Sequence, residues 1–250
     1  MHLRQILPSG LLLVSLAACG GDGSSPAEVE APSKAAAPPP EAPAPVAPPV
    51  KSIAEKRAAY HAGMLDPAQA TEQAPETFTV KFETTKGDML IDVTRAWAPT
   101  GADRFYNLVN IGFFDDVALF RVIKGFMAQF GINGDPEVSA AWKAAVIEDD
   151  PVKESNEAGY VTFARSGPNS RTTQIFVNFV DNSRLDKNGF APFGKLRDMK
   201  ALESIYWGYG ESAPRGKGPN QSLLQSKGNA YLAEEFPKLD YVKKATIVSE

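Results

Sequence analysis

Apolar and polar residues alternate along the chain from Thr77 onward, a pattern typical of strands with one buried face. The apolar positions of the first two runs are Phe78, Val80 and Phe82, then Met89, Ile91 and Val93. The turn sequence Lys86-Gly87-Asp88 separates the runs, which predicts an antiparallel pair. Further short strands are predicted at 119–124, 126–130, 160–165, 173–178 and 191–196, with a last strand in VKKATIVSE.

Two segments follow a helical period instead. TGADRFYNLVNIG, after Pro99, places its apolar residues on one face and ends at Gly112. A second helical stretch is predicted from Asn220 to Glu235, despite Gly228. About eight strands joined mostly by short turns, with two helices, predict a mainly β fold: a closed eight-stranded antiparallel β-barrel capped by two α-helices, since closure removes exposed strand edges.

The N-terminus has the layout of a secretory signal peptide. Arg4 precedes an apolar run that ends in small residues, and the run is too short to span a bilayer. Leu16-Ala17-Ala18-Cys19 resembles the bacterial lipobox, whose cysteine receives a lipid and becomes the mature N-terminus. This resemblance implies a lipoprotein signal peptide at 1–18 and a lipid bilayer as partner through acylated Cys19. Because Gly20 and not an aspartate follows Cys19, we expect the outer membrane of a bacterial cell envelope, with the chain facing the periplasm.

The rest of the chain divides into three regions. Residues 19–50 contain the lipidated cysteine and a Pro/Ala-rich tether that is expected to be disordered, because it has too few apolar residues to fold. Residues 51–76 hold a short helix, with Ser52 and Glu55 as its capping box, and a linker. Residues 77–250 form the strand-rich domain. We expect a monomer, since no heptad pattern or long apolar face suggests association.

Charge and residue types exclude several functions. The chain has 26 basic and 30 acidic residues, a net charge of −4, and no basic block that could follow a phosphate backbone, so nucleic acid is not an expected partner. His2, His61 and Cys19 all precede the strand-rich domain, which excludes a histidine-dependent nucleophile and a His or Cys metal site there. We expect no cofactor and no metal. Two adjacent acidic pairs are interpreted as solvated surface: Asp149-Asp150 and Glu234-Glu235.

Two stretches carry the candidate chemistry. LFRVIKGFMAQFG, residues 119–131, sets Arg121 among apolar residues, and SGPNSRTTQIFVNF, residues 166–179, alternates polar and aromatic positions after a Gly-Pro turn. That combination suits binding an apolar ring while a guanidinium polarises an amide. In this order the two stretches resemble the cyclophilin-type peptidyl-prolyl cis-trans isomerases, and the likeness covers most of residues 77–248.

The resemblance implies a cyclophilin-like fold and a role for each matching residue. The implied catalytic residues are Arg121, Phe126 and Gln129. The implied substrate-binding residues are Met127, Ala164, Arg165, Gln174, Phe176, Leu185 and Phe190. By this resemblance, the pocket for the proline ring is formed by Phe126, Met127, Phe176 and Leu185, and Arg121 donates to the proline nitrogen. Ala164 and Gln174 line the groove for the residues before the proline. Proline-containing polypeptides are therefore the expected substrates.

Several positions leave alternatives open. Taken alone, Arg121 alternates with Leu119 and Ile123 along a strand, which is equally typical of an arginine that reaches from a sheet into water. Arg184 stands where eukaryotic members have a tryptophan that contacts cyclosporin, so weak cyclosporin binding is expected. The glycine-rich segment 208–221 has no role that the resemblance assigns.

The expected function is peptidyl-prolyl cis-trans isomerisation that assists folding of exported proteins in the bacterial cell envelope. The reaction needs no nucleophile, because the rotating bond is a partial double bond and nothing is transferred. One alternative is a catalytically weak, membrane-tethered chaperone module that binds proline peptides. A third is a structural lipoprotein whose proline-rich tether is the functional part.

Overall fold

The computed structural model describes residues 53–248. The expected signal peptide, Cys19, the tether and Ser52 lie outside the described residues. The described strands form one nine-stranded sheet in the order β3-β9-β1-β2-β8-β6-β7-β5-β4, and its neighbours pair antiparallel. The strands are β1 Thr77–Thr84, β2 Gly87–Thr94, β3 Val117–Ala118, β4 Arg121–Ile123, β5 Met127–Phe130, β6 Tyr160–Phe163, β7 Ile175–Asn178, β8 Pro192–Leu196 and β9 Tyr241–Val248.

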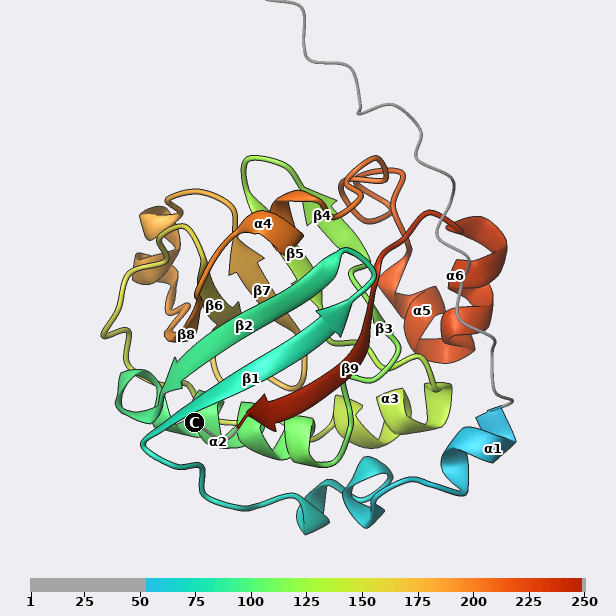
Figure 1. Ribbon diagram of the computed structural model, residues 1–250, viewed down its shortest axis with the longest axis horizontal. Coiled ribbons are helices and arrows are strands. Elements are labelled where there is room, and N and C mark those ends of the chain that lie inside the picture. The colour runs from blue at the N-terminus through green and yellow to red at the C-terminus, as the bar shows by residue number, and fades with distance from the viewer. Residues whose placement is uncertain (1–52, 249–250) are drawn as a thin grey trace, which may run out of the picture. The chain divides into compact units, whose positions relative to one another are not determined.

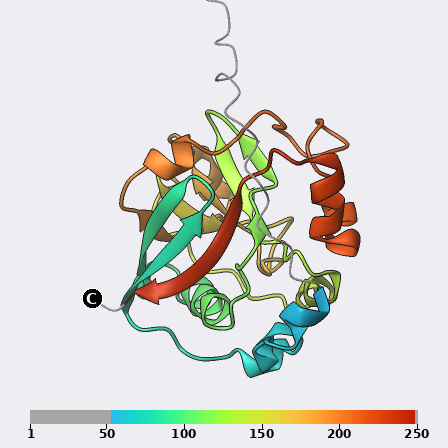
Figure 2. The same ribbon diagram turned by 45° about the vertical axis from the view of Figure 1, so that its right-hand side comes forward.

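The sheet is so strongly curled that its two end strands, which follow one another in the chain, lie close together. β3 and β4 lie at opposite ends of the strand order, yet only Leu119 and Phe120 separate them in sequence. The Leu119 amide donates to the Asp240 carbonyl at 2.9 Å, next to the pairing of β3 with β9. A mainly β, curled antiparallel sheet is therefore confirmed (Figure 2). The expected count of eight strands was too low, because one extended run, 117–123, pairs with β9 at its start and with β5 at its end.

Four of the helices lie against the sheet in two groups. The described part holds six α-helices: α1 Ile53–Arg57, α2 Pro99–Asn110, α3 Pro136–Lys143, α4 Lys200–Glu203, α5 Gln221–Lys227 and α6 Asn229–Glu235. Figure 1 shows α2 and α3 below the sheet, and α5 with α6 together at one side. The helix expected after Pro99 is confirmed as α2, but two helices were too few.

The predicted helix at 220–235 is two helices that meet at Gly228. This glycine has φ +64°, and a Cβ there would lie 2.0 Å from the Gly134 carbonyl oxygen. Only glycine avoids both the strain and the clash. Nearby, α3 was not predicted, although its start is well marked: the Asp135 carboxylate accepts the Glu137 amide at 2.9 Å, and Pro136 opens the helix.

Aromatic side chains fill the space between the sheet and α2. The ring of Phe82, on β1, lies 5.9 Å from Phe105 of α2, 5.3 Å from Phe114 and 5.7 Å from Phe130 of β5, centre to centre. All four side chains are buried. Burying one such side chain contributes about 1.5–3 kcal/mol. The alternation along β1 and β2 thus places the predicted apolar face inside the curl.

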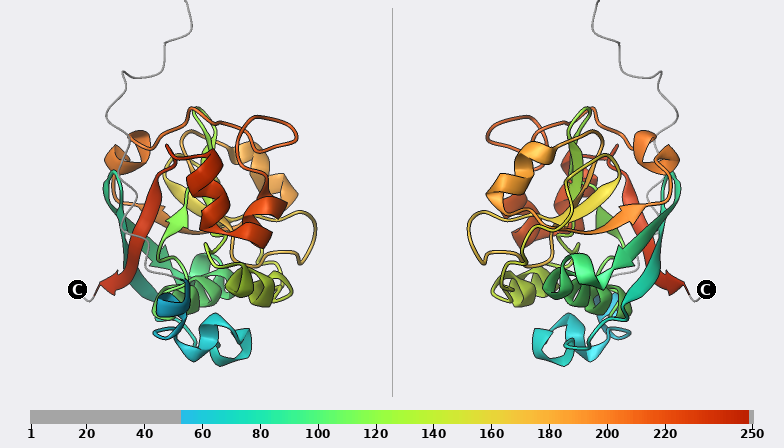
Figure 3. Two further views of the ribbon diagram at one scale, coloured as in Figure 1. Left: turned by 90° about the vertical axis from the view of Figure 1, so that its right-hand side faces the viewer. Right: turned by 90° about the vertical axis from the view of Figure 1, so that its left-hand side faces the viewer.

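The segment before β1 packs on the domain, which the sequence left undecided. Met64 is buried, and its carbonyl accepts the Trp142 indole N–H of α3 at 3.1 Å. Arg57 of α1 binds Asp135 through two hydrogen bonds of 2.7 Å each. His61 is exposed and lies beyond α1, where its Nδ1 accepts the Gly63 amide at 3.1 Å. Both views in Figure 3 place this segment beyond α2 and α3.

The interpretation of Asp149-Asp150 as solvated surface was wrong for Asp150. Its side chain is 2% exposed, and its oxygens accept the Thr100 and Gly101 amides at 2.9 Å each. These amides belong to the first turn of α2, which begins without a capping side chain of its own. Asp150 also pairs with buried Arg171 at 2.9 Å. A carboxylate distant in sequence therefore caps the helix that closes the core.

Replacing Asp150 tests how much of the stability depends on this contact. Asp150→Ala leaves Arg171 buried without its nearest carboxylate. Breaking a buried pair costs about 3–5 kcal/mol, and we expect the lower end, because Asp149 remains 3.5 Å from the Arg171 guanidinium. Urea unfolding followed by circular dichroism measures the change. The control Glu234→Ala removes an exposed carboxylate and should shift the free energy of unfolding by less than about 0.5 kcal/mol; equal midpoints for both variants would contradict the assignment.

Candidate active site

A groove of about 560 Å³ crosses the sheet where β4, β5 and β7 lie side by side. The structure brings together in its lining every residue that the sequence nominated inside the domain. These residues are Arg121, Phe126, Met127, Gln129, Ala164, Arg165, Gln174, Phe176, Leu185 and Phe190. Five further lining residues were not nominated: Ser166, Ser170, Thr172, Arg215 and Gln221.

Arg121 on β4 is held by four hydrogen bonds. Its Nε and Nη2 donate to the two carboxylate oxygens of Glu211 at 2.6 and 2.7 Å. Its Nη1 donates to Gln129 Oε1 at 2.8 Å and to Met127 Sδ at 3.8 Å. The Arg121 side chain is only 16% exposed. The alternative of a strand arginine that reaches into water is therefore wrong.

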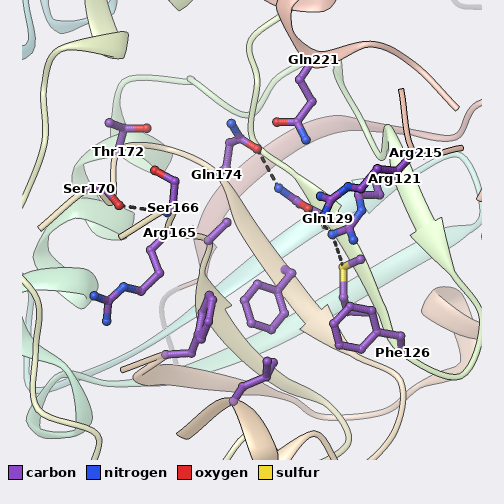
Figure 4. Close-up of a pocket in the computed structure, with 15 residues that line it drawn as sticks. Arg121, Phe126, Gln129, Arg165, Ser166, Ser170, Thr172, Gln174, Arg215 and Gln221 are labelled. Atoms are coloured by element: carbon purple, nitrogen blue, oxygen red, sulfur yellow. Dashed lines mark hydrogen bonds between the residues drawn. The ribbon is translucent and has the colours of Figure 1, made fainter. Parts of the chain in front are cut away.

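A chain of amides continues from Arg121 across the groove. Gln129 faces Arg121 in the β4–β5 register and is buried, and its Nε2 donates to Gln174 Oε1 at 2.8 Å. Figure 4 shows Gln129 between Arg121 and Gln174. Because Gln129 accepts from the guanidinium, its amide is oriented to donate to Gln174. The polar side of the groove is thus a connected network and not a set of independent side chains.

The opposite side of the groove is apolar. Phe176 of β7 packs against Phe190 with ring centres 5.8 Å apart and planes at 72°. Phe126 follows the Gly125 turn after β4, and the Arg184 guanidinium lies 5.0 Å from its ring centre. Met127 and Leu185 complete this wall. An apolar wall next to a fixed guanidinium can hold an apolar ring and polarise an amide at its edge.

Arg165 lines the groove, but its charge is engaged elsewhere. The guanidinium donates to the Gly167 and Gly189 carbonyls at 3.1 and 2.9 Å, and it lies 3.0 Å from an Asp149 oxygen. In Figure 4, Arg165 lies across the groove from Arg121. The neighbouring Ala164 amide donates to the Gln174 carbonyl at 2.9 Å. Residues 164 and 165 therefore shape the groove as an extended edge next to β7.

Glu211 is the important residue that the sequence did not nominate. It lies 90 positions after Arg121, in the segment without an assigned role, and no short motif connects the two. The hydrogen bonds from Arg121 hold the pKa of the Glu211 carboxyl below its usual range. The carboxylate therefore stays ionised and keeps the guanidinium paired. Within residues 53–248, no cluster of three or more His, Cys, Asp or Glu is arranged to hold a metal ion.

Comparison with known families agrees with this geometry. A family model described as cyclophilin type peptidyl-prolyl cis-trans isomerase/CLD matches residues 79–214, which include the strands of the groove. The chain belongs to the cyclophilin-type peptidyl-prolyl cis-trans isomerases. As a cyclophilin it is an enzyme of that class, and its reaction is the cis-trans isomerisation of peptidyl-prolyl bonds.

Relatives of this cyclophilin occur in bacteria and eukaryotes. Peptidyl-prolyl cis-trans isomerase B of Escherichia coli is 28% identical over 175 residues, which cover 68% of this chain and 99% of that protein. The isomerase cypE of Dictyostelium discoideum is 31% identical over 134 residues, or 51% of this chain and 83% of that protein. A crystal structure of a cyclophilin-type isomerase from Cryptosporidium parvum covers 70% of this chain and 99% of its own with a TM-score of 0.52 and 20% identity, a likeness of fold.

Proposed function

We propose that this cyclophilin accelerates proline-limited folding of exported proteins in the bacterial cell envelope, with Arg121 as its electrostatic catalyst. The observation that carries the catalytic part is the guanidinium of Arg121, held by Glu211 and Gln129 beside an apolar groove. Phe126 and Gln129 assist Arg121. The other nominated residues, Met127, Ala164, Arg165, Gln174, Phe176, Leu185 and Phe190, bind the substrate.

The chemistry follows from what limits rotation about the bond. Amide resonance sets a barrier of about 18–20 kcal/mol, and uncatalysed exchange takes about 10–100 s. As the bond twists, the lone pair returns to the proline nitrogen. A guanidinium that donates to this lone pair binds the twisted amide more strongly than the planar one, and such differential binding lowers the barrier. Nothing is transferred, so the reaction needs no nucleophile and no cofactor.

The groove also suits the ring and the residues before it. The Phe176–Phe190 pair, with Met127 and Leu185, offers an apolar wall for a pyrrolidine ring. The extended edge at Ala164 and the Gln174 amide offer hydrogen bonds to the chain that precedes the proline. A proline-containing polypeptide can use both halves of the groove, whereas an isolated apolar ligand would use only the apolar wall.

The envelope location is supported by the N-terminal sequence. Leu16-Ala17-Ala18-Cys19 has the form of a lipobox, and the Pro/Ala-rich residues 19–50 suit a tether between a lipid anchor and the domain. Among residues 53–248, no helix has the length and apolar character to cross a bilayer. We propose attachment through acylated Cys19, with the monomeric domain in the periplasm next to the outer membrane.

The Arg121→Ala variant tests the catalytic role. Loss of one preorganised donor typically costs about 100-fold or more in rate, so we expect kcat/KM for a short X-Pro peptide to fall by about that factor. The cis-to-trans rate is measured by nuclear magnetic resonance exchange. Arg197→Ala removes an exposed arginine directly after β8 as the matched control and should keep the rate. If the wild-type protein binds the peptide without accelerating exchange, the chaperone alternative replaces this proposal.

Cyclosporin affinity tests the character of the apolar wall. The charged Arg184 lies over Phe126 where eukaryotic members carry a tryptophan, so the wall offers no indole to an apolar cyclic peptide. We expect binding weaker than nanomolar in a fluorescence titration. The Arg184→Trp variant should bind more tightly, and nanomolar affinity of the wild-type protein would contradict the prediction.

Lipid attachment is tested at Cys19. The full chain expressed in a bacterium should incorporate labelled fatty acid and sediment with the outer membrane on a density gradient. Cys19→Ala should lose both the label and the membrane association, because a thioether-linked lipid needs the sulfur. Membrane association of the variant at the wild-type level would contradict the anchor without affecting the catalytic proposal.

A further inference from the structure

We propose that Glu211 is a positioning residue for the isomerase reaction, because its carboxylate orients the guanidinium of Arg121. The inference rests on the proposed role of Arg121 and gives a function to the loop 208–221. Glu211 does not line the groove. It therefore acts on the substrate only through Arg121.

The contact has the geometry that fixes a guanidinium in direction as well as in place. Two parallel hydrogen bonds of 2.6 and 2.7 Å join Nε and Nη2 of Arg121 to the two oxygens of one carboxylate. Bidentate pairing of this kind holds the plane of the Arg121 guanidinium, whereas a single hydrogen bond would leave the guanidinium free to rotate. The two side chains are 16% and 28% exposed, so solvent screens the pair only in part.

Counting donors shows what this pairing leaves for the substrate. A guanidinium has five N–H groups. Glu211 accepts two of them, and Gln129 and Met127 accept the two on Nη1. One N–H remains, on Nη2. The pairing thus determines which N–H group of Arg121 is available to the proline nitrogen. Loss of Glu211 would leave two more N–H groups without an acceptor, and the guanidinium would no longer be held in one orientation.

The loop is built to hold Glu211 at this position. Gly210, the residue before Glu211, forms an antiparallel β-bridge with Val122, the residue after Arg121 on β4. The Ser212 amide donates to the Glu211 carboxylate at 2.9 Å, and the Gly218 amide donates to the Glu211 carbonyl at 2.8 Å. A Cβ at Gly216 would lie 2.3 Å from that same carbonyl oxygen. The glycine-rich composition of this loop therefore lets the chain close tightly around Glu211.

Orientation matters for the rate more than for binding. Displacing a reacting group by about 1 Å can cost about 100-fold in rate. Because Arg121 also retains its contacts with Gln129 and Met127, we expect Glu211→Gln to lower kcat by about 10-fold. KM should stay within about twofold, since the groove lining is unchanged and the loss concerns the transition state alone.

A double-mutant cycle on the purified full chain tests the inference. The variants are Glu211→Gln, Arg121→Ala and the two combined, with peptide exchange measured at raised enzyme concentration for the slow variants. If Glu211 acts through Arg121, adding Glu211→Gln to Arg121→Ala changes the residual rate by less than about twofold, because coupled sites are not additive. Glu211→Asp should recover part of the rate, since it restores the charge on a shorter side chain. Glu203→Gln, an exposed glutamate on α4, is the control for loss of one charge and should keep the wild-type rate.

The outcomes separate this inference from the proposed function. If Glu211→Gln lowers the residual rate of Arg121→Ala by the same factor as in the wild type, Glu211 only maintains the loop and the inference fails. A wild-type or higher rate for Glu211→Gln alone also overturns it, because the ion pair would then not orient Arg121 productively. If Arg121→Ala keeps the wild-type rate, the role of Arg121 itself fails. Equal thermal unfolding midpoints for the wild type and Glu211→Gln verify that the comparison is between folded proteins.

Discussion

The cross-strand register of β4, β5 and β7 is the constraint on which the active site depends. It pairs Arg121 with Gln129 and Gln129 with Phe176, so that a catalytic candidate, an orienting amide and an apolar wall residue form one row across the sheet. Side chains alternate between faces along a strand, and a slip of one residue would move one member of the row to the opposite face. The groove is therefore a property of the strand pairing and not of the individual residues.

Two features outside the groove keep that register in place. The curl of the sheet joins its end strands through a run of two residues, so β4 cannot shift along β5 without moving the pairing of β3 with β9. The aromatic core around Phe82 fills the curl from α2 to β5, and Asp150 caps α2 from a distant loop. Strand pairing, core packing and helix capping thus depend on one another, which is typical of a cooperative domain.

The local patterns of the sequence predicted a large part of this arrangement. The alternation in residues 77–94 and the helical period after Pro99 were confirmed, because side-chain period and turn residues determine such elements without distant partners. The predicted helix at 220–235 was interrupted, since Gly228 is required by a close approach to Gly134 that no nearby residue reveals. Asp150 was misread for the same reason: its partners, Thr100, Gly101 and Arg171, are distant in sequence.

The sequence by itself determined the family, the strand-rich class and ten of the residues that line the groove, because each depends on an ordered motif or a short period along the chain. Only the tertiary structure decided that Arg121 is held in the groove and that Glu211 is the carboxylate that holds it. Its strand pattern also suits an exposed arginine, and the carboxylate that pairs with it lies 90 positions away in a loop without a recognisable motif. Ion pairs act through space over a few ångströms, and neither period nor spacing along a chain records which distant side chains the fold brings within that range.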